Sequence, residues 1–432
     1  MSHLDVNDRP GAHADSWYAA TATPPGPFAP LDGDARTGVV VVGGGYTGLS
    51  AALHLAEAGV DVTLIEAHRV AWGASGRNGG QVHTGQRQPQ TWLERHCGAT
   101  AARHLWNLAE DAKALTERLA RTHAPEARWT PGIVQADRSA AAARGTSAEA
   151  DHMARVYGYD RVEVLDRGAA QSLLGTDRVA GGALDRGGAH LHPLAYGFGL
   201  ARAAAAAGAR LCEGTRVRRL IPGPRPAVET DRGRVSADTV ILAAGGYLGG
   251  LDPWTAARVM PINNFIVATE PLGVRAPLAQ DVAAADDRFV VNYWRQTPDG
   301  RLLFGGGESY GARFPSDIAA VVRRPLAALY PDLAEVRVDY AWGGTLAITR
   351  SRMPVVGTPA PGVLVAGGYS GHGVAMATLA GRLLAEEAQA PSDGFAALAG
   401  VAVPPFPGGP RLRPPLLALA MSWFALRDRL GL

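Results

Sequence analysis

The sequence predicts an α/β protein built around a Rossmann-like nucleotide-binding domain, and three segments indicate it. Residues 38–66 read as a strand, a glycine loop, a helix and a second strand. Residues 238–250 add a short apolar strand that ends in small residues and glycines. Residues 362–387 give a further strand, glycine loop and helix. This alternation is typical of a parallel sheet covered by helices.

The first of these units carries the pattern of a dinucleotide site. Residues 39–42 are four consecutive valines, typical of a strand buried on both faces. Gly43, Gly45 and Gly48 follow with GxGxxG spacing. The first glycine permits the tight turn, the second lets the backbone approach a pyrophosphate, and the third lets the helix pack on the strand. The alternative, a glycine-rich structural turn, is disfavoured because helix and second strand follow in register.

A helix is predicted over residues 46–58, so Tyr46 and Thr47 fall in its first turn. Its free N–H groups and its dipole would favour a phosphate at the N-terminus. Glu66 ends the following strand, where an acid is expected to accept a hydrogen bond from a ribose hydroxyl. The same carboxylate would repel a 2′-phosphate, which argues against NADP.

The loop of residues 73–81, with the sequence GASGRNGGQ, favours FAD over NAD. An NAD-dependent dehydrogenase needs no glycine-rich loop after its acidic strand, whereas the longer FAD molecule runs on toward its isoalloxazine ring. Gly245, at the end of the strand in residues 238–250, is expected to lie against the same nucleotide. The glycine loop within residues 362–387 has no acidic strand after it and would bring a helix N-terminus to an anionic group.

Composition narrows the class of partner. The formal net charge is +2, so no nucleic acid partner is expected. Cys97 and Cys212 are the only two cysteines and stand far apart, which predicts neither a disulfide framework nor a metal site. His190 and His192 are expected to be structural, since no third ligand accompanies them. The cysteine usage fits a reducing, cytoplasmic location.

No segment is expected to cross a membrane. The first 20 residues lack the apolar core of a signal peptide, and no apolar run reaches the roughly 18 residues that a span requires. Residues 414–426, PPLLALAMSWFAL, are expected to form a helix docked on the protein's own core. The alternative is contact of this helix with a membrane surface or with another subunit.

These segments together resemble the FAD-dependent D-amino-acid-oxidase (DAO) superfamily, which includes glycine oxidase and monomeric sarcosine oxidase. Within it, the sequence is most similar to the gamma-glutamylputrescine oxidase group. The resemblance covers nearly the whole chain. It is carried by VVVVGGGYTGLSAALHLAEAG, GASGRNGGQ, GGAHLHPLAYGFGLA, DGRLLFGGG, WGGTLAITRSRMPVVG and GYSGHGVAMA.

The resemblance implies two interleaved domains, a Rossmann-like FAD-binding domain and a mostly antiparallel α+β substrate domain of the glycine oxidase and sarcosine oxidase kind. The FAD-binding domain would comprise residues 36–105, 165–255 and 345–395. The substrate domain would comprise residues 106–164 and 256–344. Residues 1–35 would form an N-terminal extension, and residues 396–432 a C-terminal tail or helix.

The resemblance also implies cofactor contacts beyond the first unit. The backbone at Val217 would meet the adenine. The helix that begins near residue 373 would direct its dipole at the N1/C2 edge of the flavin and favour the anionic reduced form. The residues expected to line the pyrophosphate and the flavin are Ser75, Arg77, Asn78, Gly79, Gly80, Gly371, His372 and Gly373.

Departures from the superfamily pattern predict how FAD is held. Some members attach FAD through a histidine in the 73–80 loop, where this chain has Arg77. Monomeric sarcosine oxidase uses a cysteine late in the chain, whereas Cys97 and Cys212 lie far upstream. We therefore expect noncovalent FAD.

Two further departures predict the substrate. Leu346 stands where glycine oxidase has an arginine for the substrate carboxylate, and Ala375 stands where sarcosine oxidase has a lysine. A buried carboxylate without a cationic partner is costly, so a small-molecule amine is expected rather than a small α-amino acid. Arg295 and Arg350 are the remaining candidates for distant anchors, with surface or sheet-edge arginines as the alternative.

The implied reaction is hydride transfer from the amine-bearing carbon to flavin N5, followed by hydrolysis of the imine to an aldehyde and ammonia. Trp342 and Tyr369 would form an apolar wall or a cation–π contact with the substrate, with core packing as the alternative for Trp342. The candidate active-site residues are His372, Trp342, Tyr369, His83 and Gln81.

The second half-reaction leaves alternatives open. We expect oxygen to accept the electrons, with release of hydrogen peroxide. The alternative acceptor is a quinone or a carrier, as in a dehydrogenase. Lys113 is predicted on a surface helix, away from the flavin. Competing functions are an amino-acid oxidase or dehydrogenase of the glycine, sarcosine or D-amino-acid type, and a noncatalytic FAD-binding protein.

Overall fold

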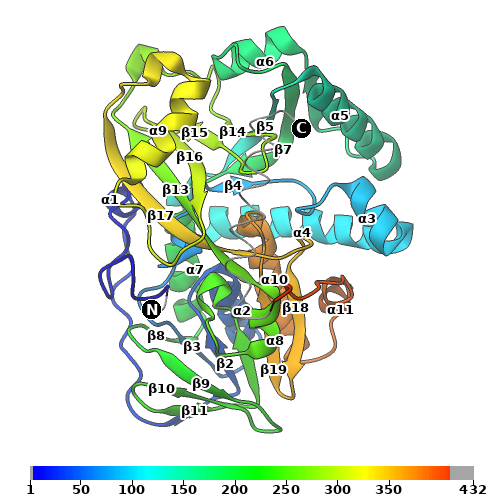
Figure 1. Ribbon diagram of the computed structural model, residues 1–432. Helices are drawn as coiled ribbons and strands as arrows, with labels where there is room; N and C mark the ends of the chain where they lie inside the picture. The colour runs from blue at the N-terminus through cyan, green and yellow to red at the C-terminus, as the bar shows by residue number, and fades with distance from the viewer. Residues whose placement is uncertain (1–2, 409–432) are drawn as a thin grey trace.

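The computed structural model describes residues 3–408, in which a nucleotide-binding half and a second, sheet-rich half lie one above the other (Figure 1). The predicted helix at residues 414–426 lies outside the described residues. No helix in residues 3–408 is long and apolar enough to cross a membrane.

The first half is built on a six-stranded sheet with the order β18-β19-β12-β2-β3-β8. The strands run parallel except β18, which is antiparallel to β19. The predicted strand–helix–strand unit is confirmed: β2, α2 and β3 occur at the expected places. The strands are β2 (Val39–Val42), β3 (Val62–Ile65), β8 (Arg210–Cys212), β12 (Thr239–Leu242), β18 (Val355–Ala360) and β19 (Val363–Gly367).

Both faces of β2 are covered, which explains its run of four valines. Val39 and Val41 pack among the helices on one face, while Val40 and Val42 pack against a four-stranded sheet on the other. The helices are α2 (Tyr46–Glu57), α4 (Ala99–His123), α7 (Pro193–Ala206) and α10 (Gly373–Glu387). The small sheet consists of β1 (Ala35–Arg36), β9 (Val217–Ile221), β10 (Ala227–Thr230) and β11 (Arg234–Ser236).

The second half is a nine-stranded sheet with the order β17-β13-β16-β15-β14-β5-β7-β4, to which β6 adds by pairing with β7. Its pairs are antiparallel except β5 with β14. Helices α5 (Ala140–His152), α6 (Arg167–Leu174) and α9 (Ile318–Leu329) lie at its outer side (Figure 1). The strands are β4 (Gln81–Val82), β5 (Thr130–Asp137), β6 (Val162–Leu165), β7 (Gly181–His190), β13 (Met260–Thr269), β14 (Ala283–Asp286), β15 (Tyr293–Gln296), β16 (Leu302–Ser309) and β17 (Val338–Ile348).

The domain limits remain a prediction, and strand pairing suggests two adjustments to it. β7 pairs with β5 and β6 in the nine-stranded sheet, although residues 165–255 were expected in the FAD-binding domain. Helix α4 packs on α7 and α10 of the first half, although the expected limit at residue 105 would divide it. We propose that the first half keeps α4 and resumes after β7. The remaining helices are α1 (Trp17–Thr21), α3 (Gln90–Cys97), α8 (Pro253–Arg258) and α11 (Asp393–Ala399).

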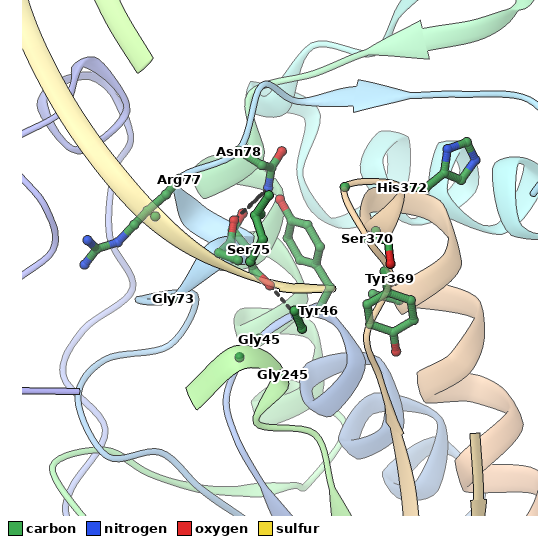
Figure 2. A pocket seen from close by; sticks show the side chains of 18 of the residues that line it. Gly45, Tyr46, Gly73, Ser75, Arg77, Asn78, Gly245, Tyr369, Ser370 and His372 are labelled. Atoms are coloured by element: carbon green, nitrogen blue, oxygen red, sulfur yellow. Dashed lines mark hydrogen bonds between the residues drawn. The ribbon is translucent and has the colours of Figure 1, made fainter. Parts of the chain in front are cut away.

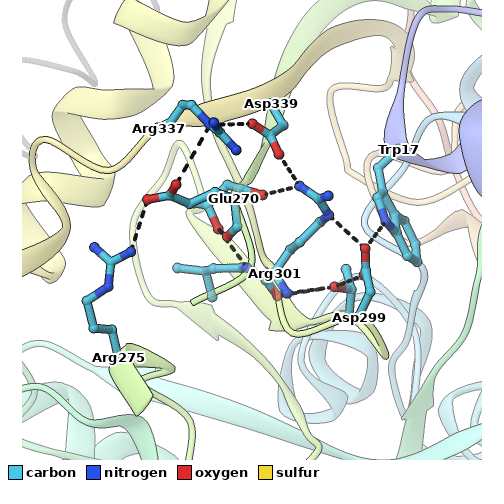
Figure 3. Close-up of polar contacts among 10 residues, drawn as sticks. Trp17, Glu270, Arg275, Asp299, Arg301, Arg337 and Asp339 are labelled. Atoms are coloured by element: carbon cyan, nitrogen blue, oxygen red, sulfur yellow. Dashed lines mark hydrogen bonds and ion pairs between the residues drawn. The ribbon is translucent and has the colours of Figure 1, made fainter. Parts of the chain in front are cut away.

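The N-terminal segment is fastened to the second half by a polar network (Figure 3). Nε1 of Trp17 in α1 donates to Asp299 at 3.2 Å, and Arg301 pairs with the same carboxylate at 2.7 Å. Arg301 also pairs with Asp339 in β17 at 2.5 Å. The segment before residue 35 therefore contributes to the body of the protein, since Trp17 is buried as well.

Candidate active site

A cavity of about 590 Å³ opens where the two halves meet. Its wall is formed by the loop after β2, the end of β3, residues 72–79, the residues after β12, parts of β16 and β17, and the loop before α10. Several of these segments converge in Figure 2. Segments that are far apart in the sequence therefore line one space.

Glycines shape the cavity at the start of α2. Gly43 has a φ of 110°, and a Cβ there would lie 2.8 Å from the carbonyl oxygen of Ala243. A Cβ on Gly45 would lie 2.9 Å from Oγ of Ser75. Gly48 lies outside the cavity wall, where a Cβ would collide with the carbonyl oxygen of Gly43. Gly43 thus permits the tight turn and Gly48 the packing of the helix, as the spacing predicts, whereas the approach of Gly45 to a pyrophosphate remains a prediction.

The N-terminus of α2 faces this space without a side-chain cap from its own N-cap residue, Gly45. Oγ of Ser75 accepts the N–H of Tyr46 at 3.0 Å (Figure 2). Thr47 lines the same wall, and its hydroxyl lies 2.7 Å from Oη of Tyr369. Such an end, with its dipole and its remaining N–H groups, suits an anion.

Glu66 lies at the end of β3 in the cavity wall. Its two oxygens accept backbone N–H groups of Gly44 at 2.7 Å and His68 at 2.8 Å. Burial raises the pKa of this carboxyl, and the backbone hydrogen bonds oppose the rise. The carboxylate thus braces the glycine loop. Val217 of β9 and Gly245 line the same cavity.

Asn78 holds the 73–80 loop in shape. Its amide nitrogen donates to the carbonyl oxygens of Ala74 and Ser75 at 3.0 and 2.9 Å, and its amide oxygen accepts the N–H of Gly80 at 2.8 Å. Gly79 lines the cavity against the ring of Tyr293. Gly80 lies behind the wall with a φ of 76°, where a Cβ would strike a neighbouring carbonyl. Gly80 therefore shapes the loop, and the prediction that it lines the cavity is wrong.

Two histidines meet at another part of the cavity. His83 and His372 are stacked with ring centroids 5.4 Å apart. Burial lowers the pKa of His83 to about 4 and of His372 to about 3, so both are neutral at pH 7. The Coulomb field of Arg87 acts in the same direction on both.

The hydrogen bonds fix the tautomers of these rings. Nε2 of His372 lies 2.9 Å from the carbonyl oxygen of Gly85, which can only accept, so this nitrogen carries the proton. Gln81 donates its amide to Ala284, so its oxygen is free to accept from Nε2 of His83 at 3.0 Å. Each neutral ring therefore keeps an Nδ1 lone pair as an acceptor.

The loop before α10 completes this wall. Gly371, with a φ of 88°, Gly373 and Tyr369 all line the cavity. His372 is the N-cap residue of α10 and makes no side-chain cap. A second helix N-terminus is thus directed at the same space as that of α2.

The chain matches the family model described as FAD dependent oxidoreductase (DAO) over residues 38–387. The protein belongs to this family. A probable oxidoreductase OrdL of Rhizobium meliloti is 44% identical over 96% of this chain and 97% of its own. The gamma-glutamylputrescine oxidoreductase of Escherichia coli is 38% identical over 97% of this chain and 99% of its own. Glycine oxidase from Geobacillus kaustophilus shares the fold, with a TM-score of 0.69 at 22% identity over 83% of this chain and 96% of that chain.

FAD is the cofactor of this DAO-family oxidoreductase, and the cavity fits it. The glycine cradle leaves no room for side chains beside the start of α2, and the N-termini of α2 and α10 are suited to anionic parts of the molecule. Glu66 and Val217 line the same space as the α10 loop, as one long ligand requires. The individual contacts remain predictions.

Arg77 lines the cavity, and its contact with the pyrophosphate remains a prediction. Its guanidinium turns away from the other labelled side chains (Figure 2) and pairs with Asp8 at 2.9 Å. It also donates to the carbonyl oxygens of Trp72 and Gly343 at 2.8 and 3.1 Å. A buried guanidinium needs such partners, so Arg77 ties the N-terminal segment to β17.

The prediction that Trp342 forms a wall of the active site is wrong. The residue is buried, does not line the cavity, and donates its Nε1–H to the carbonyl oxygen of Arg77 at 3.0 Å. Tyr18 of α1 packs against its ring at 5.2 Å. The alternative interpretation, core packing, holds because the 73–80 loop and α1 cover the indole.

Lys113 is buried, contrary to the predicted surface position. Its ammonium pairs with Glu110 at 2.8 Å and donates to Thr84 at 2.8 Å. It also stands 4.9 Å from the ring of Tyr159. Thr84 lines the cavity, so Lys113 lies directly behind the wall.

The two predicted distant anchors do not line the cavity. Arg295 donates to the carbonyl oxygen of Gly79 at 2.9 Å and so supports the glycine loop. Arg350 is exposed and donates to the carbonyl oxygen of Pro405 at 3.1 Å. The arginines that do line the cavity are Arg77, Arg87, Arg216, Arg288 and Arg352, of which the sequence pattern indicated only Arg77.

Proposed function

We propose that this DAO-family oxidoreductase oxidises the carbon–nitrogen bond of an amine, gamma-glutamylputrescine or a similar polyamine derivative. The products would be an aldehyde and ammonia. The observation that carries the proposal is Leu346, which lines the cavity where the glycine oxidase pattern would place a carboxylate-binding arginine. The relationship to the Escherichia coli enzyme over nearly the full length supports the same substrate class.

The described side chains suit an amine. His83 and His372 are neutral at pH 7, so they do not repel an approaching ammonium. Their Nδ1 lone pairs are suited to accept an N–H of the amine. Tyr369, whose pKa is raised by burial, keeps its proton and orients its hydroxyl on Thr47. FAD supplies the two-electron acceptor when it is bound.

A second candidate is oxidation of an amino acid at its α-carbon. Arg87 favours it, because this cation lines the same cavity as the two histidines and donates to the carbonyl oxygen of Ser370, two residues before His372. A carboxylate held by Arg87 would bring an α-amine toward the same rings.

We also propose that FAD is held without a covalent bond, that oxygen reoxidises it with release of hydrogen peroxide, and that the protein works in the cytoplasm. Cys97 and Cys212 support the first and third points, since neither lines the cavity and both are free thiols. A quinone or carrier is the alternative acceptor.

Product analysis tests the proposal. Purified holoenzyme is incubated in air with gamma-glutamylputrescine, putrescine, glycine and sarcosine in turn, and ammonia, aldehyde and hydrogen peroxide are measured. We expect all three products from gamma-glutamylputrescine and little or none from glycine or sarcosine. Products from the amino acids alone would establish the second candidate instead.

A further inference from the structure

Three charged side chains in the cavity wall have no part in the amine oxidation proposed first above. Arg87 follows β4, Glu308 lies in β16, and Arg352 lies in the turn between β17 and β18. They come from three separate segments and reach one space. All three are half-buried.

None of the three has an ion-pair partner among the described residues. Arg87 donates Nε–H to the carbonyl oxygen of Ser370 at 3.2 Å, and Glu308 accepts from Tyr310 at 3.1 Å. The guanidinium of Arg352 stands 4.9 Å from the ring of Phe289. Within residues 3–408, no opposite charge lies within 4.0 Å of any of them.

The electrostatics show that these charges are desolvated. Burial lowers the pKa of Arg87 to about 10, and it also lowers the pKa of Arg352. Burial raises the pKa of Glu308, and the field of Arg352 opposes the rise. Charges withdrawn from water without partners are costly, so a ligand that supplies the partners would be bound strongly.

Their arrangement suits a ligand with two opposite charges. Arg352, Arg87 and Glu308 line one cavity, yet neither arginine makes an ion pair with the carboxylate. Arg352 also has a φ of 62°, a backbone conformation that is rare outside glycine and concentrates at ligand sites.

We propose that Arg352 and Arg87 bind the carboxylate, and Glu308 the ammonium, of an α-amino-acid head group at the end of the substrate remote from the oxidised amine. This inference rests on the proposed function and narrows its substrate class to γ-glutamyl amides of diamines. Leu346 and Ile348 of β17 line the same cavity and suit the methylene chain between the two ends. The site would distinguish such amides from free diamines.

Binding of an unreactive probe tests the site apart from turnover. The probe is γ-L-glutamyl-n-butylamide, which keeps the head group and lacks the terminal amine. It is titrated calorimetrically into FAD-loaded wild type, Arg352→Gln, Glu308→Gln and Arg350→Gln. Arg350 is exposed, stands two residues from Arg352 and does not line the cavity, so its variant is the matched control. We expect Arg352→Gln and Glu308→Gln to weaken binding by about tenfold or more, and the control to leave it unchanged.

Two further probes, each lacking one charge of the head group, are titrated into the wild type. They test which charges are recognised without relying on a variant that could fail to fold. Glutaric acid mono-n-butylamide lacks the ammonium, and 4-aminobutyric acid n-butylamide lacks the carboxylate. We expect each to bind about tenfold or more weakly than the full head group. Equal binding of all three probes would overturn the proposal.

The proposed function and the head-group site can fail separately. If gamma-glutamylputrescine is oxidised but Arg352→Gln and Glu308→Gln bind the probe like the wild type, the site is wrong and the function stands. If no amine is oxidised but the probe binding depends on both residues, the function is wrong and the site stands.

Discussion

At the scale of single residues, the pair of Asp8 and Arg77 joins the N-terminal segment to the glycine loop. The side chains are 13% and 3% exposed, so the pair is nearly dry. Arg77 belongs to the loop of residues 73–80 that lines the FAD cavity. Its carbonyl oxygen accepts the Trp342 indole N–H. Loss of one partner would leave a buried charge unpaired.

We expect Asp8→Ala to lower the free energy of unfolding by about 3 kcal/mol, because the guanidinium stays buried without its carboxylate. Thermal and urea unfolding of the holoenzyme measure it. The control is Asp15→Ala, since Asp15 is 88% exposed and pairs with Arg9, which is 79% exposed. We expect that control to change stability by less than about 0.5 kcal/mol. Equal effects of the two variants would contradict the assigned role of Asp8.

The two cavity histidines predict a pH dependence. Their pKa values are lowered to about 4 and about 3 in the folded protein, against 6.5 for an unperturbed histidine. Above pH 6.5 both states are neutral and the native state keeps its full stability. As the pH falls below 6.5 the unfolded chain binds protons first, so stability is lost progressively toward pH 4 and below.

We therefore expect the wild type to lose about 4 kcal/mol more stability than His83→Gln/His372→Gln between pH 7.5 and pH 5, about 2 kcal/mol for each ring. Urea unfolding at the two pH values measures the difference. The background contribution from all other groups is common to both proteins and cancels. Parallel pH profiles would show that the rings are not held neutral.

Single residues also show where sequence reasoning stops. The positions of Gly43, Gly45 and Glu66 follow from local spacing, and the structure places them at the cavity. Trp342 and Lys113 were assigned to the correct elements but to the wrong environments. Which side of a strand or helix is covered depends on segments elsewhere in the chain, and no local pattern encodes it.

At the scale of elements, Arg301 connects four segments (Figure 3). It pairs with Asp299 and Asp339, and it donates to the carbonyl oxygen of Thr269 at 2.8 Å. Through Asp299 it reaches Trp17 of α1. Its side chain is 15% exposed, so water competes little for these contacts.

We expect Arg301→Ala to destabilise the protein by about 2 kcal/mol, since two carboxylates and a carbonyl lose a common donor. Arg337→Ala is the matched control, because Arg337 also pairs with Asp339 but is 69% exposed. We expect a change of less than about 0.5 kcal/mol for the control. The unfolding midpoints of both variants measure the two effects. An Arg337→Ala variant destabilised as much as Arg301→Ala would contradict the stabilising role assigned to Arg301.

Elements that form from local sequence were predicted well. The run from β2 to β3 and the run from β19 to α10 carry their own strand, turn and helix signals. The nine-stranded sheet was expected only through a resemblance, because its pairing joins distant segments. The parallel pair of β5 with β14 joins residues 133–136 to residues 283–286. No local sequence pattern indicates a pairing between segments so far apart.

At the scale of the whole molecule, the cavity exists because the two halves meet. The glycines at the start of α2 that line it belong to the first half, whereas Glu308 and Leu346 belong to strands of the second. The three charged residues Arg87, Glu308 and Arg352 could not be foreseen, since only tertiary structure brings them together. FAD-dependent oxidation was predictable from the cofactor motifs. The charged residues proposed to bind the far end of the substrate were not.

The absence of a covalent link to FAD is also a whole-molecule prediction. Acid precipitation of the purified protein should release all flavin colour into the supernatant, because Cys97 and Cys212 do not line the cavity and Arg77 stands at the histidine position. The absorbance of pellet and supernatant after precipitation measures it. Colour that stays with the pellet would show a covalent bond to another residue.

The most direct test of amine oxidation is the visible spectrum of the holoenzyme under anaerobic conditions. We expect gamma-glutamylputrescine to bleach the flavin band within the mixing time or shortly after, and the colour to return when air is admitted. A band that stays bleached in air would support a dehydrogenase. The claim that the substrate is an amine would still stand. Bleaching by glycine or sarcosine, but by no amine without an α-carboxylate, would contradict the central claim.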